Sequence, residues 1–314
     1  MIGGCIGTSN VLAGQMFDIP VKGTHAHSWI MSFKTELEAF RNYANLYPDN
    51  CLLLVDTYDT LKSGVPHAIQ VFDELKAKGI QPKLYGIRLD SGDLAYLSKK
   101  ARKMLDAAGH KDAIISASSD LDEYLIDSLH TQGAQITSWG VGTNLITSKN
   151  CPAFGGVYKL AAVENEKGEF IPKIKVSENI EKVTNPGDKT VFRLYDKETG
   201  KIKADLIALA DEHYDSQQPL MIFDPISTWK KTWLDGGSYT VRELLVPVFK
   251  DGQCVYTSPA VMDIRDYCSS ELTTLWDESR RLVNPQEVYV DLSQPLWDLK
   301  NTLLDHVHNF QDNK

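Results

Sequence analysis

The first half of the chain repeats one local pattern, which limits the folds open to it more than any other feature. A short apolar run is followed by a small or polar loop and then by a segment with helical spacing, at intervals of roughly 25–35 residues. The apolar runs hardly alternate with polar residues, as expected for strands covered on both faces. The pattern predicts βα units in a parallel sheet or barrel. The runs lie at residues 20–23, 51–55, 83–89, 113–117 and 135–139.

From about residue 155 onwards the pattern changes. A strand-rich section follows, in which residues 164–169 and 196–201 have the composition of hairpin turns, and from about Asp205 a smaller mixed region is expected. At the other end, a helical pattern over residues 11–17 starts so close to Met1 that the chain is expected to begin part-way through a domain. These features predict an α/β protein with a smaller C-terminal α+β region.

Composition argues against several classes of protein. The net charge of −9 argues against nucleic-acid binding, which needs basic patches. No run of about 18 apolar residues is present, and the first residues lack the basic and apolar segments of a signal peptide, so we expect no membrane association. The five cysteines are dispersed, which fits a reducing cytoplasm and offers no zinc framework. We therefore expect a cytoplasmic protein.

The motif richest in functional groups follows the apolar run at 83–89. It reads Arg88-Leu-Asp90-Ser91-Gly92-Asp93 and precedes a helical pattern. Because strand-to-helix loops of α/β proteins open onto one shared crevice, this cluster predicts a ligand site. Arg88 is suited to hold a carboxylate or phosphate, and an aspartate is suited to meet sugar hydroxyls, a metal or a developing cation. The alternative is that Asp93 caps the helix and Arg88 lies on the surface, which explains one of these residues but not the cluster.

Two histidines at positions i and i+2 follow the apolar run at 20–23. His25 and His27 allow three interpretations: a zinc pair, a nucleophile or proton carrier, or structural residues. Zinc needs further ligands at later strand ends. Four of the later histidines do not fall there, namely His67, His110, His130 and His213.

Two later loops have the composition of a phosphate cradle. Gly140-Val-Gly142 follows a late apolar run, and Ser119-Asp120 follows the one before it, where Asp120 is also placed to cap the next helix. The alternative is two ordinary tight turns. Asp56, at the end of another apolar run, is a candidate ligand contact, with turn and cap chemistry as an equal alternative.

Together these motifs resemble the nicotinate phosphoribosyltransferase family. They occur in family order from about Gly7 to Leu160, and the remainder is similar to the family's C-terminal region. The resemblance implies an irregular, N-terminally incomplete β/α (TIM-like) barrel over residues 1–204 and a C-terminal α+β region over residues 205–314. The matching segments are GTSNVLAG, GTHAHSWIMSF, DTYDTLKSGV, GIRLDSGDLAYLSKKARKMLDAAG, ISASSDLDEYLIDSL, SWGVGTNLITS and FGGVYKL.

The resemblance also implies an activity. Such enzymes join nicotinate to phosphoribosyl pyrophosphate in NAD biosynthesis and salvage, giving nicotinate mononucleotide and pyrophosphate. ATP hydrolysis is coupled through a phosphorylated histidine, which corresponds to His27 here. Mg²⁺ accompanies phosphoribosyl pyrophosphate and ATP, no resident metal or tightly bound organic cofactor is implied, and the complete form is expected to be a homodimer.

The family pattern assigns roles to residues of this sequence. The catalytic positions are His27 and Asp90. The substrate-binding positions are Thr24, Ser28, Arg88, Ser91 and Gly92. The phosphate-binding positions are Ser119, Asp120, Gly140, Gly142 and Thr143.

Two alternatives to this function remain. Nicotinamide phosphoribosyltransferase shares the architecture, although the wording Gly-Thr-His-Ala-His-Ser-Trp favours the enzyme that uses nicotinate. Family members carry an N-terminal domain before the segments found here, so the chain is expected to be a C-terminal fragment. A fragment of this kind also allows a non-catalytic ligand-binding or interaction role.

Overall fold

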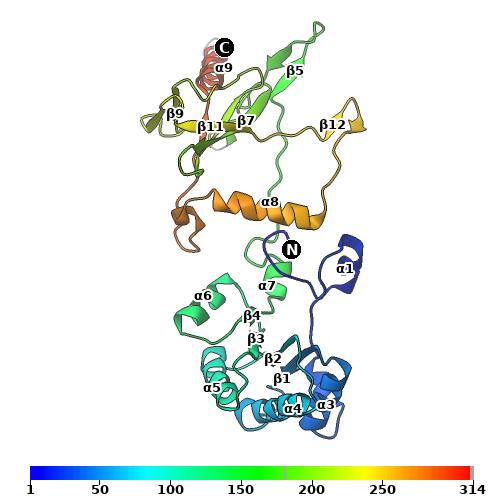
Figure 1. Cartoon of the computed structure of the whole chain (residues 1–314). Coiled ribbons are helices and arrows are strands. Elements are labelled where there is room, and N and C mark those ends of the chain that lie inside the picture. The colour runs from blue at the N-terminus through cyan, green and yellow to red at the C-terminus, as the bar shows by residue number, and fades with distance from the viewer. Residues whose placement is uncertain (180–181, 312–314) are drawn as a thin grey trace. The chain divides into compact units, whose positions relative to one another are not determined.

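The computed structural model describes residues 1–179 and 182–311. It divides into two compact units, one over Val21–Gly155 and the other formed by Met1–Pro20 together with Gly156–Lys314 (Figure 1).

The unit over Val21–Gly155 contains a four-stranded parallel sheet, in the order β1-β2-β3-β4. Helices follow the strands as the repeated sequence pattern predicts. The strands are β1 (Asn50–Leu54), β2 (Leu84–Leu89), β3 (Ile114–Ala117) and β4 (Ser138–Trp139). The helices are α2 (His27–Met31), α3 (Glu36–Leu46), the π-helical turn η1 (Thr60–Gly64), α4 (Val65–Ala77), α5 (Leu94–Ala107), α6 (Glu123–Thr131) and α7 (Thr143–Ile146).

This sheet confirms the α/β class but not the closed barrel. β1 and β4 are the outer strands of an open sheet, and the described residues contain no strand pairing that joins them. The apolar run at 20–23 forms only an isolated bridge at Val21 instead of a strand. Pro20 lacks a backbone N–H and glycine disfavours extended structure, which explains why the run does not extend the sheet.

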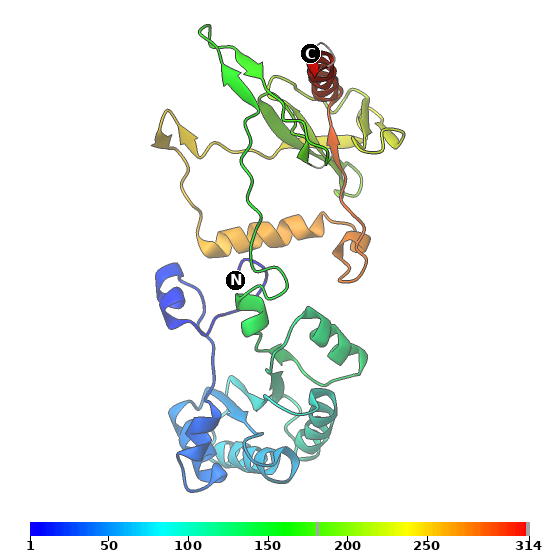
Figure 2. The ribbon, with the colours of Figure 1, turned by 180° about the vertical axis from the view of Figure 1, so that it is seen from behind.

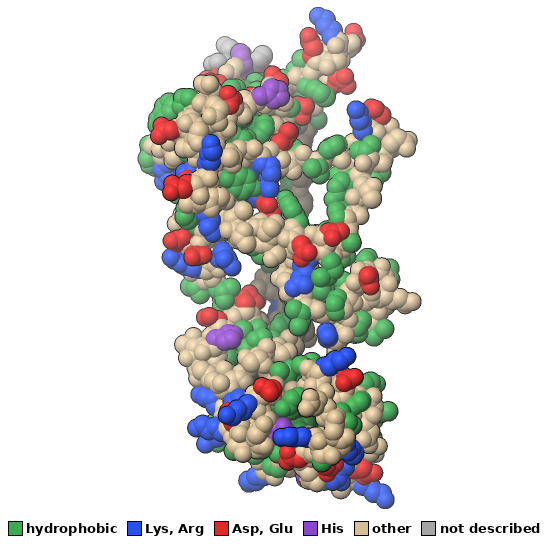
Figure 3. Space-filling view, viewed as in Figure 1, with side chains coloured by type: hydrophobic (Ala, Val, Ile, Leu, Met, Phe, Trp, Pro, Cys, Tyr) green, Lys and Arg blue, Asp and Glu red, His purple; other side chains and the backbone are tan. Residues whose placement is uncertain are grey.

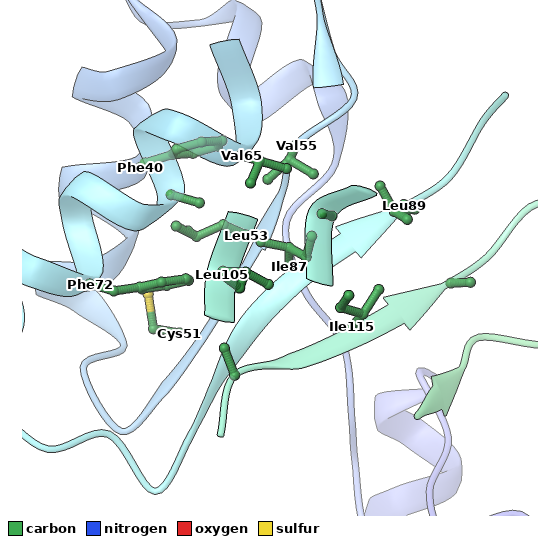
Figure 4. Close-up of a cluster of buried hydrophobic side chains, with 14 of the residues drawn as sticks. Phe40, Cys51, Leu53, Val55, Val65, Phe72, Ile87, Leu89, Leu105 and Ile115 are labelled. Carbon is green, nitrogen blue, oxygen red and sulfur yellow. The ribbon is translucent and has the colours of Figure 1, made fainter. Parts of the chain in front are cut away.

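The core of this unit lies between the sheet and its helices (Figure 4). Leu53, Ile87 and Ile115 come from three adjacent strands and are almost completely buried. Phe40 of α3 and Phe72 of α4 belong to the same cluster. Burial of apolar surface contributes about 25 cal/mol per Å², so this cluster holds the strand ends, and the loops that follow them, at one edge.

The second unit is mainly antiparallel. Its central sheet has the order β11-β7-β8-β14, in which only β14 pairs in parallel. Helix α9 lies beside β8 (Figures 1 and 2). The strands are β5 (Ala162–Glu164), β6 (Phe170–Pro172), β7 (Lys189–Asp196), β8 (Ile202–Leu209), β9 (Leu220–Phe223), β10 (Lys231–Leu234), β11 (Tyr239–Glu243), β12 (Phe249–Lys250), β13 (Gln253–Cys254) and β14 (Val290–Leu292). The helices are α1 (Val11–Phe17), α8 (Val261–Thr273), the 3₁₀ turn η3 (Asp277–Arg280) and α9 (Gln294–Gln311).

The compact units have different limits from the expected domains 1–204 and 205–314. Residue 204 lies within β8, where Ala204 pairs with Leu194 of β7 and both side chains are buried. The strand-rich section therefore packs with the C-terminal region, because the β7–β8 hairpin cannot be divided without exposing this core. The two expected hairpin turns are confirmed, between β5 and β6 and between β7 and β8.

Charge is mixed on the surface. Acidic and basic side chains are interspersed on the face shown in Figure 3, in both units. Within the part of the chain that the structure describes, none of the helices combines the length and apolar character of a membrane span.

Candidate active site

The predicted functional loops meet at the carboxyl edge of the β1–β4 sheet. Asp56 follows β1, Asp90 follows β2, Ser118 follows β3 and Gly140 follows β4. Because parallel strands end at the same edge, residues far apart in the chain become neighbours here, such as Thr24 and Arg88, which are 64 positions apart. His27, the first residue of α2, completes the group.

The side chain of Asp56 contacts both the loop after β2 and His27. Its side chain is only 2% exposed. Oδ2 accepts hydrogen bonds from the backbone N of Asp90 at 2.8 Å and from Oγ of Ser91 at 2.7 Å. Oδ1 is buried and has no hydrogen-bond partner among the described residues. The sequence left this residue undecided, and the only signal was a carboxylate directly after a buried strand.

The two ring nitrogens of His27 have different surroundings. Nδ1 lies 2.9 Å from Oγ1 of Thr57. Nε2 lies 3.6 Å from Oδ2 of Asp90 and 3.9 Å from Oδ1 of Asp56. When Nδ1 carries its proton and donates to Thr57, Nε2 is free to act as a nucleophile, and the two carboxylates stabilise positive charge on the ring. The side chain is 39% exposed, so a ligand has access to it.

Arg88 is tied into the site and does not lie free on the surface. It extends from β2 and donates a hydrogen bond to Oγ1 of Thr24, and its Nη2 lies 4.0 Å from Oδ2 of Asp90. Its Nε is buried without a partner among the described residues. An unpaired guanidinium N–H beside a ligand site is suited to a carboxylate or phosphate oxygen.

His25 has a structural position. Its ring is buried, and Nε2 accepts a hydrogen bond from the backbone N of Leu54 at 3.3 Å. The ring packs edge-on against Tyr43 at a centroid distance of 4.5 Å. Burial lowers the pKa of His25 to about 4, so the ring is neutral near pH 7. Since its Nε2 lone pair accepts a backbone hydrogen bond, the structure does not favour the zinc interpretation of the His25–His27 pair.

The loops after β3 and β4 are joined to each other. Nδ2 of Asn144 donates to the backbone oxygens of Asp120 at 2.7 Å and Leu121 at 3.2 Å. Ser119 and Asp120 have left-handed backbone conformations, with φ of 101° and 45°. Such strain in residues other than glycine is often found at ligand sites.

The expectation that Asp120 caps α6 is wrong. Asp122 is the cap, because its Oδ1 accepts a hydrogen bond from the backbone N of Leu125 at 2.8 Å. The left-handed turn at residues 119–120 delays the start of the helix. Asp120 is exposed and is not used as a cap, so its side chain is open to a ligand.

Ser118 connects the loop after β3 to Asp90. Its Oγ donates to Oδ1 of Asp90. Sequence reasoning missed this contact, and the only local signal for it is the position of the serine at a strand end. Asp93 is the N-cap of α5, because its Oδ1 accepts a hydrogen bond from the backbone N of Tyr96 at 2.9 Å. This confirms the capping alternative for Asp93.

The remaining predicted residues lie at the same edge without side-chain contacts to this group. Gly92 turns the chain into α5 with φ of 76°, Thr143 starts α7, and Ser28 is exposed on α2. Direct contacts therefore connect the histidine, arginine and aspartate positions, whereas the predicted phosphate-binding loops join them through Ser118.

Family models match most of this chain. The family model described as "Nicotinate phosphoribosyltransferase (NAPRTase) family" matches residues 2–195, and the model described as "Nicotinate phosphoribosyltransferase C-terminal domain" matches residues 188–300.

Named relatives agree with these models. Nicotinate phosphoribosyltransferase of Bacillus subtilis (strain 168) is 48% identical over 300 residues, which cover 96% of this chain and 60% of that protein. The Dictyostelium discoideum protein of the same name is 34% identical, covering 98% of this chain and 59% of that protein. The chain thus spans about three-fifths of the length of these relatives.

Solved structures show the same fold. The structure of human nicotinic acid phosphoribosyltransferase superimposes with a TM-score of 0.75 at 27% identity, over 96% of this chain and 66% of that one. The nicotinate-nucleotide pyrophosphorylase of Pyrococcus furiosus, with a TM-score of 0.60 at 21% identity over 87% of this chain and 60% of that one, shares the fold. The chain belongs to the nicotinate phosphoribosyltransferase family.

Proposed function

We propose that this chain carries the catalytic centre of a nicotinate phosphoribosyltransferase, which forms nicotinate mononucleotide and pyrophosphate from nicotinate and phosphoribosyl pyrophosphate. The observation that carries the proposal is the contact group at the carboxyl edge of the sheet, where His27, Arg88, Asp56 and Asp90 lie together. The names of the relatives point to the same reaction.

Each part of the site has a role in holding the substrates. The unpaired N–H of Arg88 is suited to the carboxylate of nicotinate or to a substrate phosphate. The joined loops after β3 and β4 present backbone N–H groups and small residues to the 5′-phosphate, as loops after late strands of α/β folds do. Holding both substrates in this geometry supplies much of the rate acceleration.

The bond exchange takes place at C1 of the ribose. The bond from C1 to the pyrophosphate oxygen breaks, its electron pair leaves with pyrophosphate, and the pyridine nitrogen forms the new bond from the opposite face. Positive charge develops on the ribose during this exchange, and the carboxylates of Asp56 and Asp90 are preorganised to stabilise it.

ATP acts by transferring its γ-phosphoryl group to His27. Nε2 attacks the γ-phosphorus, an N–P bond forms and the bond to ADP breaks. The added negative charge next to Asp56 and Asp90 alters the balance of charge at the site, which is how such a modification reorganises loops. Classification as an ATP-dependent ligase rests on this step.

The residues of the site fit Mg²⁺. Mg²⁺ is held in proteins by one or two carboxylates together with substrate phosphates. Asp56 has a buried oxygen without a partner among the described residues, and Asp90 lies beside it, so these two residues would hold the ion. When bound, the ion neutralises charge on the leaving pyrophosphate.

We also propose a larger setting for this site. The two open edges of the β1–β4 sheet fit an irregular β/α barrel in the complete protein, with these four strands as part of it. A homodimer in the cytoplasm remains part of the proposal.

The test starts with the chain itself. Calorimetry with nicotinate mononucleotide is expected to show binding that Arg88→Ala weakens by about tenfold or more, because a charge-assisted contact is lost. Turnover is measured with nicotinate and with nicotinamide, and preference for nicotinamide would transfer the assignment to the other enzyme. Binding of the nucleotide without turnover would favour a non-catalytic role, and absence of both would contradict the proposal.

His27 is tested by its link to ATP. His27→Ala is expected to abolish the stimulation of product formation by ATP, because the phosphoryl acceptor is removed. His213→Ala, in the other unit, is the matched control and should keep the stimulation. If ATP still stimulates the His27→Ala variant, the role of this residue is wrong.

A further inference from the structure

A second site lies in the unit that contains β7–β14, and it does not depend on the proposed activity. There a cavity of about 490 Å³ is lined by β8, β9, β10, η3 and the segment that leads into β14. Its volume lies within the range of small-molecule sites, which are about 300–1,000 Å³. The wall is partly apolar, with Ile202, Ile222 and Leu275, and partly aromatic, with Trp276 and Tyr289.

An acidic side chain lines this cavity without a partner. Asp291 of β14 is only 4% exposed, and its carboxylate contacts no hydrogen-bond donor or cation in the described part of the chain. Burying a carboxylate in this way is unfavourable unless a donor or a positive charge meets it. The pKa of Asp291 reflects this unfavourable position: burial and the neighbouring Asp224 raise it to about 6.

Two of the three lysines in the wall are paired with carboxylates other than Asp291, and the third, Lys231 of β10, is exposed. Nζ of Lys203 lies 2.9 Å from Oδ2 of Asp196, and Nζ of Lys230 lies 3.9 Å from Oδ2 of Asp224. Oδ1 of Asp224 is also occupied, because it accepts hydrogen bonds from the backbone N atoms of two residues in its own turn. Glu278 and Glu287 also line the cavity, but both are exposed, so Asp291 is the buried carboxylate left to meet a ligand.

The residue types favour an organic ligand over a metal ion. The described residues contain no group of three or more histidine, cysteine, aspartate or glutamate side chains arranged to hold a metal. A cationic nitrogen with an apolar body satisfies both the carboxylate and the apolar wall.

We propose that this cavity binds a small organic molecule whose protonated amine, amidine or guanidine group donates to Asp291, while its apolar body packs against Ile222, Leu275 and Trp276. Charge-assisted hydrogen bonds set the orientation of the ligand. Nothing in the phosphoribosyl transfer reaction uses this cavity, so it adds a binding function to the C-terminal region.

Benzamidine is the probe, because its planar amidinium matches a carboxylate in a bidentate way and its ring is apolar. Binding to the full chain is measured by calorimetry and ligand-observed NMR at neutral pH. Asp291→Asn keeps the size of the side chain but removes its charge, and is expected to weaken benzamidine binding by about tenfold or more. Asp277→Asn is the matched control, since Asp277 lies on the same turn as the cavity wall with a side chain 92% exposed, and should bind like the parent chain.

A second variant keeps the test decisive if Asp291→Asn does not fold. Ser279→Trp, on the short turn η3, fills the cavity from its wall and is expected to abolish benzamidine binding while Asp291 is unchanged. Neutral benzamide should bind more weakly than benzamidine to the parent chain. The inference is overturned if benzamidine fails to bind the parent chain at about 10 mM, a level that detects even weak specific binding, or if all variants bind it equally.

Binding of nicotinate mononucleotide is measured on the same variants. It should be unaffected by Asp291→Asn, so that loss of benzamidine binding and failure of the proposed transferase function are distinguished.

Discussion

Asp56 lies at the end of β1, and its buried carboxylate binds the loop that follows β2. Its two hydrogen bonds hold the backbone N of Asp90 and the side chain of Ser91, while its other oxygen faces His27. A single side chain thus holds the loops of two βα units together. A buried acceptor in this position is expensive to change, because each donor that it satisfies would lose its partner.

Asp56→Asn tests this role. The amide keeps the shape of the side chain but has only one acceptor oxygen. Its N–H₂ group must face either His27 or the donors of Asp90 and Ser91. We expect the free energy of unfolding to fall by about 1–3 kcal/mol and nucleotide binding to weaken, as measured by urea unfolding and calorimetry. Asp127→Asn, on an exposed position of α6, is the control and should change neither quantity. A stable variant with unaltered binding would show that Asp56 does not organise the site.

The buried ring of His25 makes stability depend on pH in a predictable direction. Its pKa is lowered from 6.5 to about 4 by burial, so between these pH values the unfolded chain binds more protons than the folded one. Stability is therefore retained above pH 6.5 and is lost as the pH falls toward 4, by up to about 3 kcal/mol for this group.

Urea unfolding at several pH values between 7 and 4 measures this loss. His25→Gln lacks the titrating ring and should lose less stability over the same pH range, although it starts lower at pH 7 because the packing against Tyr43 is reduced. Equal pH dependence of the two proteins would mean that His25 titrates normally in the folded state.

At the scale of elements, the turn between β1 and α4 decides how closely the site loop is held. The π-helical turn η1 ends at Gly64, where a Cβ atom would lie 1.8 Å from the backbone oxygen of Val55. Only glycine allows the start of α4 to approach the end of β1 this closely. The loop that carries Asp56 and Thr57 runs between Val55 and Gly64, so this close approach fixes both of its ends.

Gly64→Ala is expected to move this loop. The clash is with backbone atoms, which have little freedom to shift, so we expect a loss of about 1–3 kcal/mol in the free energy of unfolding. Weaker nucleotide binding should accompany it. Gly3→Ala, where an added Cβ meets no atom within 4 Å, is the matched control. Thermal unfolding measures the stability of both variants, and calorimetry measures their nucleotide binding. A Gly64→Ala variant with unaltered stability and binding would rule out the close approach.

At the scale of the whole molecule, the chain contains two separate hydrophobic cores. Leu53 lies in the core of the parallel sheet, and Leu206 lies in the core of the antiparallel sheet. Each leucine is almost completely buried. The unit with the proposed catalytic centre and the unit with the proposed amine site therefore depend on different sets of apolar contacts.

Leu53→Ala and Leu206→Ala test this division. Each variant should lose about 2–5 kcal/mol of stability through the cavity that it creates. Hydrogen exchange is expected to show the greater loss of amide protection within the unit that carries the substitution. Leu46→Ala, where the side chain is 62% exposed, is the control. Equal loss of protection across both units in both variants would show one cooperative core instead of two.

Much of the site could be predicted because its signals are local. The order of strand, polar loop and helix follows from hydrophobic periodicity, and the cluster at Arg88 and Asp90 is contiguous in the chain. Turn chemistry is local too, but a shift of two residues was enough to misplace the α6 cap, since the left-handed turn at Ser119 and Asp120 is not visible in the residue types.

The sequence by itself determined the βα pattern, the family resemblance and the loops that carry function, because each depends on residues close together in the chain. Tertiary structure alone decided that Asp56 binds the next loop, that His25 is buried while His27 is accessible, and that Asp291 faces a cavity. The physical reason is that burial and hydrogen-bond partners are set by strands that pair across long separations, as β14 does with β8. Local periodicity predicts that a strand forms, but not which side chains it will meet.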